Sequence, residues 1–65
     1  MYDYLYHSKW KDKNNNVYLV NNVIVNRSDN DAMYVYYTCI NGIGLNISYV
    51  MKVIDFHITF DKVTS

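Results

Sequence analysis

The chain is poor in several residue types, and each shortage narrows the range of possible folds. Its 65 residues include no proline, no glutamate, two glycines and one cysteine. The lack of proline and the scarcity of glycine argue against a linker-rich or disordered chain. The hydrophobic fraction of 51% is enough for one small core. Because Cys39 is the single cysteine, an intrachain disulfide is excluded.

The chain also lacks net charge and long apolar runs. Six basic and six acidic side chains give a formal charge of zero. A general nucleic-acid binder depends on an excess of Lys and Arg, so this class is disfavoured. No apolar run approaches the roughly 20 residues of a membrane span. Residues 1–7 have neither the basic nor the apolar region of a signal peptide. We therefore expect no membrane contact and a cytoplasmic location, which also suits the lone cysteine.

Tyrosine and β-branched residues are abundant, with eight tyrosines, and these residue types favour strands. Residues 33–49 resemble a β-hairpin, because Asn41 and Gly42 form the pair that favours a two-residue type I′ turn. That turn would set the register of the two strands. The facing pairs would be Ile40 with Ile43, Thr38 with Leu45, Tyr36 with Ile47 and Tyr34 with Tyr49.

The rest of the chain yields four further elements and two polar turns, at residues 11–16 and 27–31. Residues 2–7 are predicted to form a strand, with a short helical turn as the alternative. Residues 17–26 favour one long strand with a bulge at Asn21 and Asn22, and a tight hairpin there is the alternative. Ser48 is predicted to cap a 3₁₀ turn over 49–52. The alternation over 53–60 predicts a last, half-buried strand.

This order of elements predicts an all-β fold, a small five-stranded SH3-like barrel with one short 3₁₀ turn. A single domain spans residues 1–65, of which 61–65 are a polar tail. The predicted core is Trp10, Tyr18, Val20, Ile24, Tyr36, Ile40, Leu45, Ile47, Ile54, Phe56 and Ile58.

A chain-wide pattern of short pieces supports this fold. The pieces are Tyr6-His7, Lys9, Tyr18-Leu19-Val20, Val23-Ile24, Val35-Tyr36, Gly44-Leu45-Asn46-Ile47, Phe60 and Asp61-Lys62-Val63. In this pattern the chain resembles short bacterial and phage domains of unknown function with an SH3-like fold. In that group Arg-Pro commonly follows the Gly-Leu strand, where this chain has Ser48 and Tyr49. The resemblance implies a small phage accessory protein in the cytoplasm of a bacterial host cell.

No residue pattern predicts an active site, so we expect no enzyme and no cofactor. His7, Cys39 and His57 are the only soft metal ligands, and none has a second ligand at short spacing. Cys39 would need a basic neighbour to act as a nucleophile, and a buried thiol is the simpler interpretation. Asp29 and Asp31 lie in a predicted turn. The segment 42–44 is too short for a phosphate-binding loop.

The surplus of aromatic residues predicts a protein-binding surface. A domain of this size cannot bury all its tyrosines, and exposed Tyr and Trp are typical contact residues. The candidate contact residues are Trp10, Met33, Tyr34, Val35, Tyr37 and Tyr49. We therefore expect a non-enzymatic interaction module that docks on a host protein through these side chains or through an unpaired strand edge. It would inhibit that protein or be sensed by a host defence factor.

Two alternatives remain open from the sequence. Lys9, Lys11 and Lys13 flank Trp10, and this set would suit single-stranded nucleic acid, whose bases stack on aromatic rings. A structural homo-oligomer is the other alternative, with the apolar face of residues 33–39 buried between copies.

Overall fold

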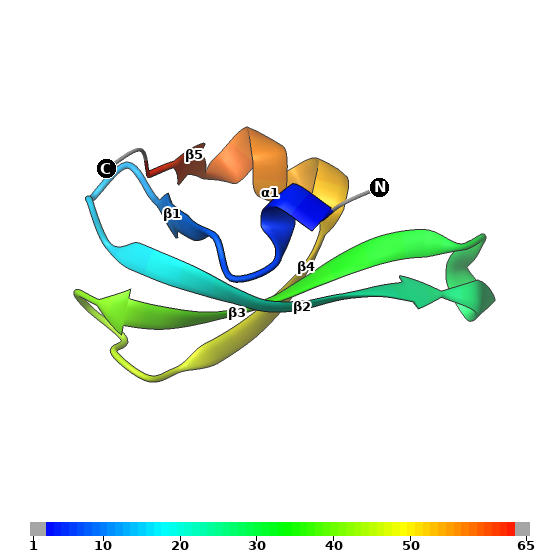
Figure 1. The fold of residues 1–65 in the computed structure, drawn as a ribbon, viewed down its shortest axis with the longest axis horizontal. Coiled ribbons are helices and arrows are strands. Elements are labelled where there is room, and N and C mark those ends of the chain that lie inside the picture. The colour runs from blue at the N-terminus through cyan, green and yellow to red at the C-terminus, as the bar shows by residue number, and fades with distance from the viewer. Residues whose placement is uncertain (1–2, 64–65) are drawn as a thin grey trace.

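A computed structural model of the chain describes residues 3–63. It contains one antiparallel sheet of five strands and one short helix (Figure 1). The elements in chain order are η1 Asp3–Leu5, β1 Lys9–Lys11, β2 Val17–Asn26, η2 Arg27–Asp29, β3 Ala32–Asn41, β4 Ser48–Lys52, α1 Val53–Thr59 and β5 Asp61–Lys62. The strand order across the sheet is β4-β3-β2-β1-β5, which makes β4 and β5 its two outer strands.

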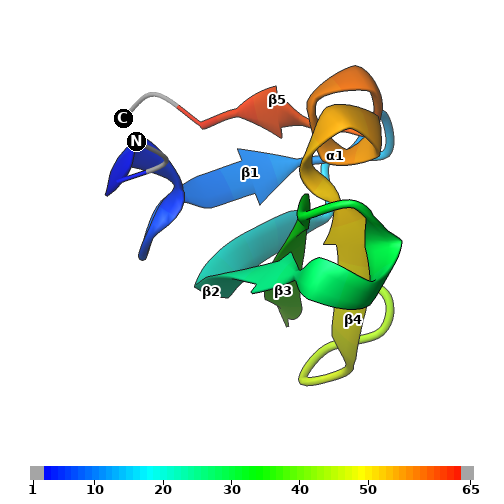
Figure 2. The same cartoon turned by 90° about the vertical axis from the view of Figure 1, so that its right-hand side faces the viewer.

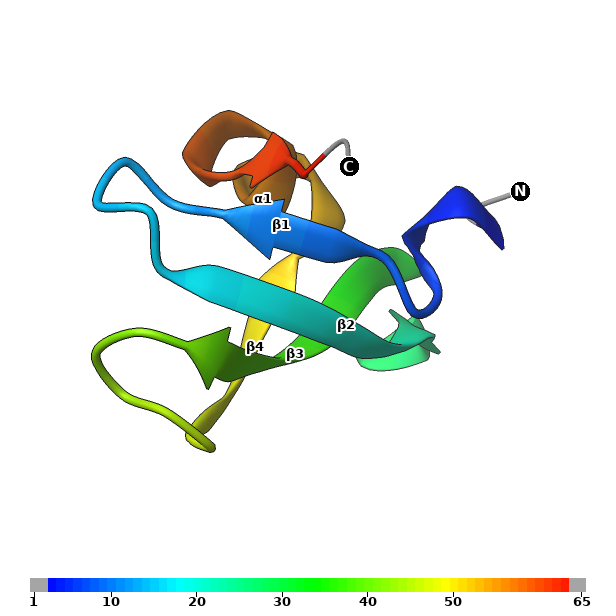
Figure 3. The ribbon, with the colours of Figure 1, turned by 60° about the vertical axis from the view of Figure 1, so that its left-hand side comes forward.

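The long strands β2 and β3 form the centre of the sheet, and β1 crosses beside β2 (Figure 3). The pairing register of β2 with β3 shifts between Val20 and Asn22, so the predicted bulge in β2 is confirmed. The buried residues of β2 show its effect, because Tyr18 and Val20 are two positions apart while Val23 follows after three. One extra residue in the strand restores the inward orientation beyond the bulge.

The first segment forms a 3₁₀ turn rather than a strand, so the helical alternative for residues 2–7 is correct over the described part. Tyr2 lies outside the described residues. The amide of Ser8 donates to the carbonyl of Leu5, and Leu5 is fully buried. His7 has a φ of 58°, which turns the chain into β1.

The turn after β1 is confirmed, although Lys11 still belongs to the strand. Asp12 organises it by accepting hydrogen bonds from the amides of Asn14 and Asn16 and from the hydroxyl of Tyr18. Burial, followed by the bond to Asp12, raises the pKa of Tyr18 to about 12. The second predicted turn is also present as η2 with the residues that follow it.

The predicted two-residue turn at Asn41 and Gly42 is wrong. Residues 42–47 form a longer loop, and Tyr37 pairs with Tyr49 while Thr38 pairs with Ser48. Gly42, Gly44 and Asn46 all adopt positive φ, so the backbone turns more than once before β4 begins. The side chain of Asn16 anchors the loop by accepting a hydrogen bond from the amide of Ile43.

The types of the two elements predicted after this loop are wrong. Residues 48–52 form β4 instead of a 3₁₀ turn, and 53–59 form α1 instead of a strand. Within this region Val53, Phe56 and Phe60 are buried, at intervals of three and four residues. These intervals follow the helical period, whereas the alternating pattern also present in the sequence does not decide burial. Asp61 and Lys62, predicted to lie in the tail, pair with β1 as β5.

The core lies between the concave side of the sheet, η1 and α1. It consists of Leu5, Trp10, Tyr18, Val20, Val23, Val35, Tyr37, Cys39, Val53, Phe56 and Phe60. The core prediction is therefore correct for Trp10, Tyr18, Val20 and Phe56. It is wrong for Ile24, Tyr36, Ile40, Leu45, Ile47, Ile54 and Ile58, which are all exposed. On β3 the side chains of Val35, Tyr37 and Cys39 point into the core, whereas Tyr36 and Ile40 were predicted to do so. Successive residues of a strand face opposite sides of the sheet, so an error of one residue exchanges the buried set with the exposed set.

The sheet is not closed into the predicted barrel (Figure 2). In the part of the chain that the structure describes, β4 pairs only with β3 and β5 pairs only with β1. The physical reason is the helix at 53–59, which leaves just two residues for the last strand. A strand of that length does not reach β4, and α1 packs between the two sheet ends instead (Figure 2).

Substitutions on α1 distinguish a helix from the alternating strand. We expect Phe56→Ala to lower the free energy of unfolding by about 3–5 kcal/mol, because it empties the centre of the core. Ile58→Ala is the matched control, since Ile58 is 82% exposed, and should change it by less than about 0.5 kcal/mol. Urea denaturation followed by tryptophan fluorescence measures both values. Equal losses for the two variants would contradict the helix.

Candidate functional site

The convex face of the sheet carries a patch of apolar side chains around a shallow depression. On this outer face Tyr36 lies between Asn22 of β2 and Val50 of β4, and Ile24 lies opposite Tyr34. The depression has a volume of about 670 Å³. Its lining is Ile24, Val25, Asn26, Arg27, Tyr34, Tyr36 and Val50. We call this set the outer patch.

Ionic and polar contacts fix one end of the outer patch. The Tyr34 hydroxyl donates to Oδ2 of Asp29 at 2.7 Å, and Nζ of Lys52 lies 3.2 Å from the same oxygen. These bonds hold the pKa of Asp29 below its usual value, with the Tyr34 bond as the larger cause. The same contacts raise the pKa values of Tyr34 and Lys52. Asp29 therefore ties the η2 turn to β3 and β4, and fixes the orientation of Tyr34.

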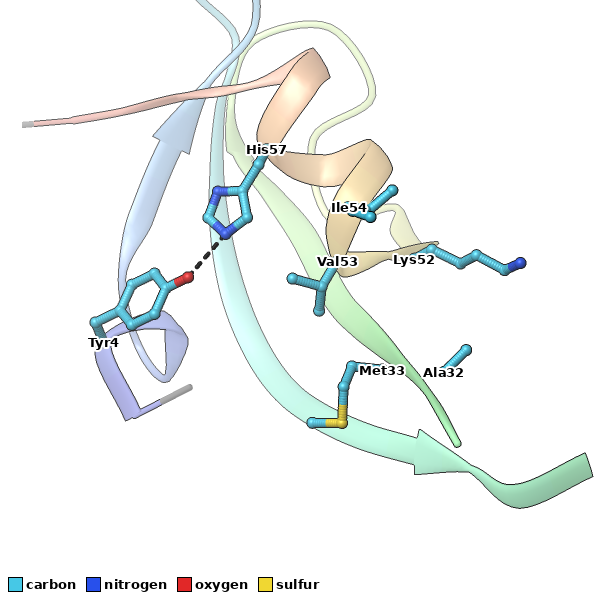
Figure 4. A pocket seen from close by; sticks show the side chains of 7 residues that line it. All are labelled: Tyr4, Ala32, Met33, Lys52, Val53, Ile54 and His57. Carbon is cyan, nitrogen blue, oxygen red and sulfur yellow. Dashed lines mark hydrogen bonds between the residues drawn. The ribbon is translucent and has the colours of Figure 1, made fainter. Parts of the chain in front are cut away.

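A second depression, of about 600 Å³, lies on the other side of β3, between η1, the start of β3 and α1 (Figure 4). Its lining is Tyr4, Ala32, Met33, Lys52, Val53, Ile54 and His57. The Tyr4 hydroxyl lies 2.8 Å from Nε2 of His57, and the two rings stack. Figure 4 shows this pair closing one side, with Met33 and Val53 between it and Lys52. The walls are mainly apolar, and His57 already has a hydrogen-bond partner.

The structure places the predicted contact residues on different sides of the fold. Trp10, Val35 and Tyr37 are buried in the core, so they do not belong to an exposed surface. Met33 packs partly against the core, Tyr34 is half-buried at the outer patch, and Tyr49 is exposed beside the buried tyrosines. The face of residues 33–39 that was predicted to meet a partner is the interior of the domain. A homo-oligomer through this face would require Val35, Tyr37 and Cys39 to leave the core.

The aromatic ring on which bases would stack in the nucleic-acid alternative is not accessible at the surface. Lys9, Lys11 and Lys13 are exposed, but Trp10 is buried and its indole N–H donates to Oγ of Ser8. The indole ring packs at 5.0 Å from the ring of Phe56. A base could stack on Trp10 only after the core opened.

The remaining reactive side chains do not assemble into a site. Cys39 is buried, and its thiol donates to the carbonyls of Asn41 and Ile43. Over residues 3–63, no three His, Cys, Asp or Glu side chains gather closely enough to hold a metal ion. None of the described helices is both long and apolar enough to cross a membrane.

Sequence reasoning missed the residues that are in fact exposed and apolar. Ile24 and Tyr36 were predicted to lie in the core, Val50 was placed in the predicted 3₁₀ turn, and Ile54 and Ile58 were predicted to lie in the core on a strand face. The helical spacing of Val53, Phe56 and Phe60 was a signal that could have identified Ile54 and Ile58 as exposed.

Comparison with known proteins gives no relative for this chain. No protein-family model, curated protein or solved structure matches it. The resemblance to short bacterial and phage domains therefore stays a prediction.

The Asp29 contacts predict acid-sensitive stability. Because the folded-state pKa of Asp29 is lowered, its contribution is present above the unfolded value of about 4 and is lost as the pH falls through the folded value. We expect the melting temperature of the wild type to fall below about pH 4. Asp29→Asn should fall less steeply there. Asp12→Asn is the comparison, since the pKa of Asp12 is also lowered. If Asp29→Asn leaves the acid slope unchanged, the proposed link is wrong.

Proposed function

We propose that this chain is a non-enzymatic protein-interaction module that binds its partner through the outer patch. The observation that carries the proposal is the apolar character of a sheet face that no other element covers in the described fold. Tyr36 of β3 is paired with Val50 of β4 and lies diagonally from Ile24 of β2, and each of the three is at least one-third exposed. Exposed apolar groups gathered in this way are typical of contact surfaces.

The chemistry of the patch suits a protein partner. Tyr and Arg are enriched among the residues that contribute most to protein interfaces, and the patch contains Tyr36, Tyr34 and Arg27. Arg27 makes a long 3.9 Å contact to Asp31 and its side chain is 87% exposed, so its guanidinium is available at the rim. A partner that offers an apolar side chain next to a carboxylate would complement both features.

The biological setting of the proposal follows from the resemblance described for the sequence. A small phage accessory protein in a bacterial cytoplasm would meet host proteins, and occupation of a host surface would either inhibit that protein or reveal the phage to a defence factor. Both outcomes require the same contact, so the outer patch serves either one.

Paired tyrosine substitutions test this function. Tagged protein is used to capture partners from bacterial lysate, and the captured protein is then titrated against each variant. Tyr36→Ala should weaken binding by at least about tenfold, because it removes a large side chain from the centre of the patch. Tyr4→Ala is the matched control, since Tyr4 is similarly exposed but lines the other depression.

Binding that survives Tyr36→Ala and is lost in Tyr4→Ala would move the contact to the second depression. Capture of nucleic acid alone, released by moderate salt, would replace the protein-binding proposal by the nucleic-acid alternative.

A further inference from the structure

The outer strand β4 has an open edge. It is bonded to β3 in an unshifted register over all five of its residues, and the described residues give it no partner on the other side. In the strand order it stands at the opposite end of the sheet from β5, and Figure 2 shows it running from the 42–47 loop up to α1. Natural edge strands are usually protected by proline, a bulge or a central charge. β4 has none of these, because its single charge, Lys52, stands at its end.

The sequence of β4 is complementary to itself. If two copies of the strand pair antiparallel about Val50, Tyr49 lies opposite Met51 of the second copy and Val50 lies opposite Val50. Aromatic rings and methionine sulfur attract each other, and two valines form a favourable pair across strands. Lys52 lies opposite Ser48, so no like charges meet, and Asp29 already partners its ammonium group.

The residues that flank β4 extend the same complementarity. Before the strand, the loop exposes Ile43, Leu45 and Ile47, and after the strand α1 exposes Ile54 and Ile58. Ile54 is 73% and Ile58 is 82% exposed, and both lie on one side of the helix because they are four residues apart. A two-fold axis at Val50 brings the loop of one copy to the helix of the other. In such a pair, contact between the loop and the helix would remove exposed apolar surface of both copies from water.

We propose that β4 pairs antiparallel with β4 of a second copy of this chain, centred on Val50, and so forms a symmetric dimer with one continuous sheet. The zero net charge gives the two copies no long-range repulsion. The other edge strand is a poor alternative, since β5 has only two residues and both are charged. The proposed dimer shares Val50 with the outer patch, whereas Ile24 and Arg27 of that patch lie on β2 and in η2, away from this edge.

Sedimentation of the intact chain tests the proposal first. A monomer has a mass of 7.7 kDa, and we expect a concentration-dependent species of twice that mass. A wild type that stays monomeric at high concentration overturns the proposal. A larger species that grows into rings or fibres also overturns it, because that behaviour indicates contact between two different edges.

Charge substitutions at the two-fold axis then test the register. Val50→Lys and Val50→Asp should each raise the dimer dissociation constant by at least about tenfold, because like charges then lie directly opposite each other. An equimolar mixture of the two variants should recover the doubled mass as a mixed dimer. Val50 is 53% exposed in the single chain, so both variants should keep the fold, which circular dichroism checks.

Ile24→Lys is the matched control, since it places the same charge on the same sheet face but on β2. This variant should dimerise like the wild type while losing the partner of the outer patch. Dimers that persist in Val50→Lys, or a mixture that stays monomeric, would show that β4 does not pair about Val50. Because Val50 also lines the outer patch, Val50→Lys should weaken both contacts, whereas Ile24→Lys should weaken partner binding alone. The mass of the Ile24→Lys variant therefore reports on the dimer and its partner binding reports on the outer patch, so failure of one proposal is distinguishable from failure of the other.

Discussion

The packing of Phe56 and Phe60 against the sheet is the contact on which the rest of the structure depends. Their rings lie about 5 Å from those of Trp10, Tyr18 and Tyr37, which come from three different strands. Aromatic pairs at these distances add to the stabilisation from buried area alone. These ring contacts join the helix to β1, β2 and β3 without a disulfide. It explains how so short a chain maintains a core.

The helix that supplies these two rings also decides the surface of the molecule. Seven residues in α1 leave two for β5, so the sheet remains open and β4 keeps a free edge. Packing on one side of the helix sends Ile54 and Ile58 outward, and the inward orientation of Tyr37 sends Tyr36 to the convex face. The exposed apolar groups that we assign to partner binding and dimerisation are therefore consequences of how the core is packed.

Sequence patterns predicted the backbone correctly where side chains bond to backbone groups only a few residues away. The polar turns at 11–16 and 27–31 form because Asp and Asn side chains bond to nearby amides, as Asp12 and Asn26 do here. The bulge in β2 follows from two asparagines between two apolar runs. The same reasoning failed at Asn41 and Gly42, where a tight turn was possible locally but Asn16, distant in sequence, binds the loop in a longer form.

The sequence alone determined a mainly β fold, its two long central strands and the polar turns at 11–16 and 27–31, because composition and short-range hydrogen bonding act within a few residues. Only the tertiary structure decided which face of β3 is buried, whether residues 53–60 are helix or strand, and where the open edge lies. In residues 53–60 the apolar side chains fit a period of two as well as the helical period, so local preference was ambiguous. In the fold, the aromatic rings of β1, β2 and β3 contact Phe56 and Phe60 together, and the rings of these two residues lie 4.8 Å apart because about one helical turn separates them.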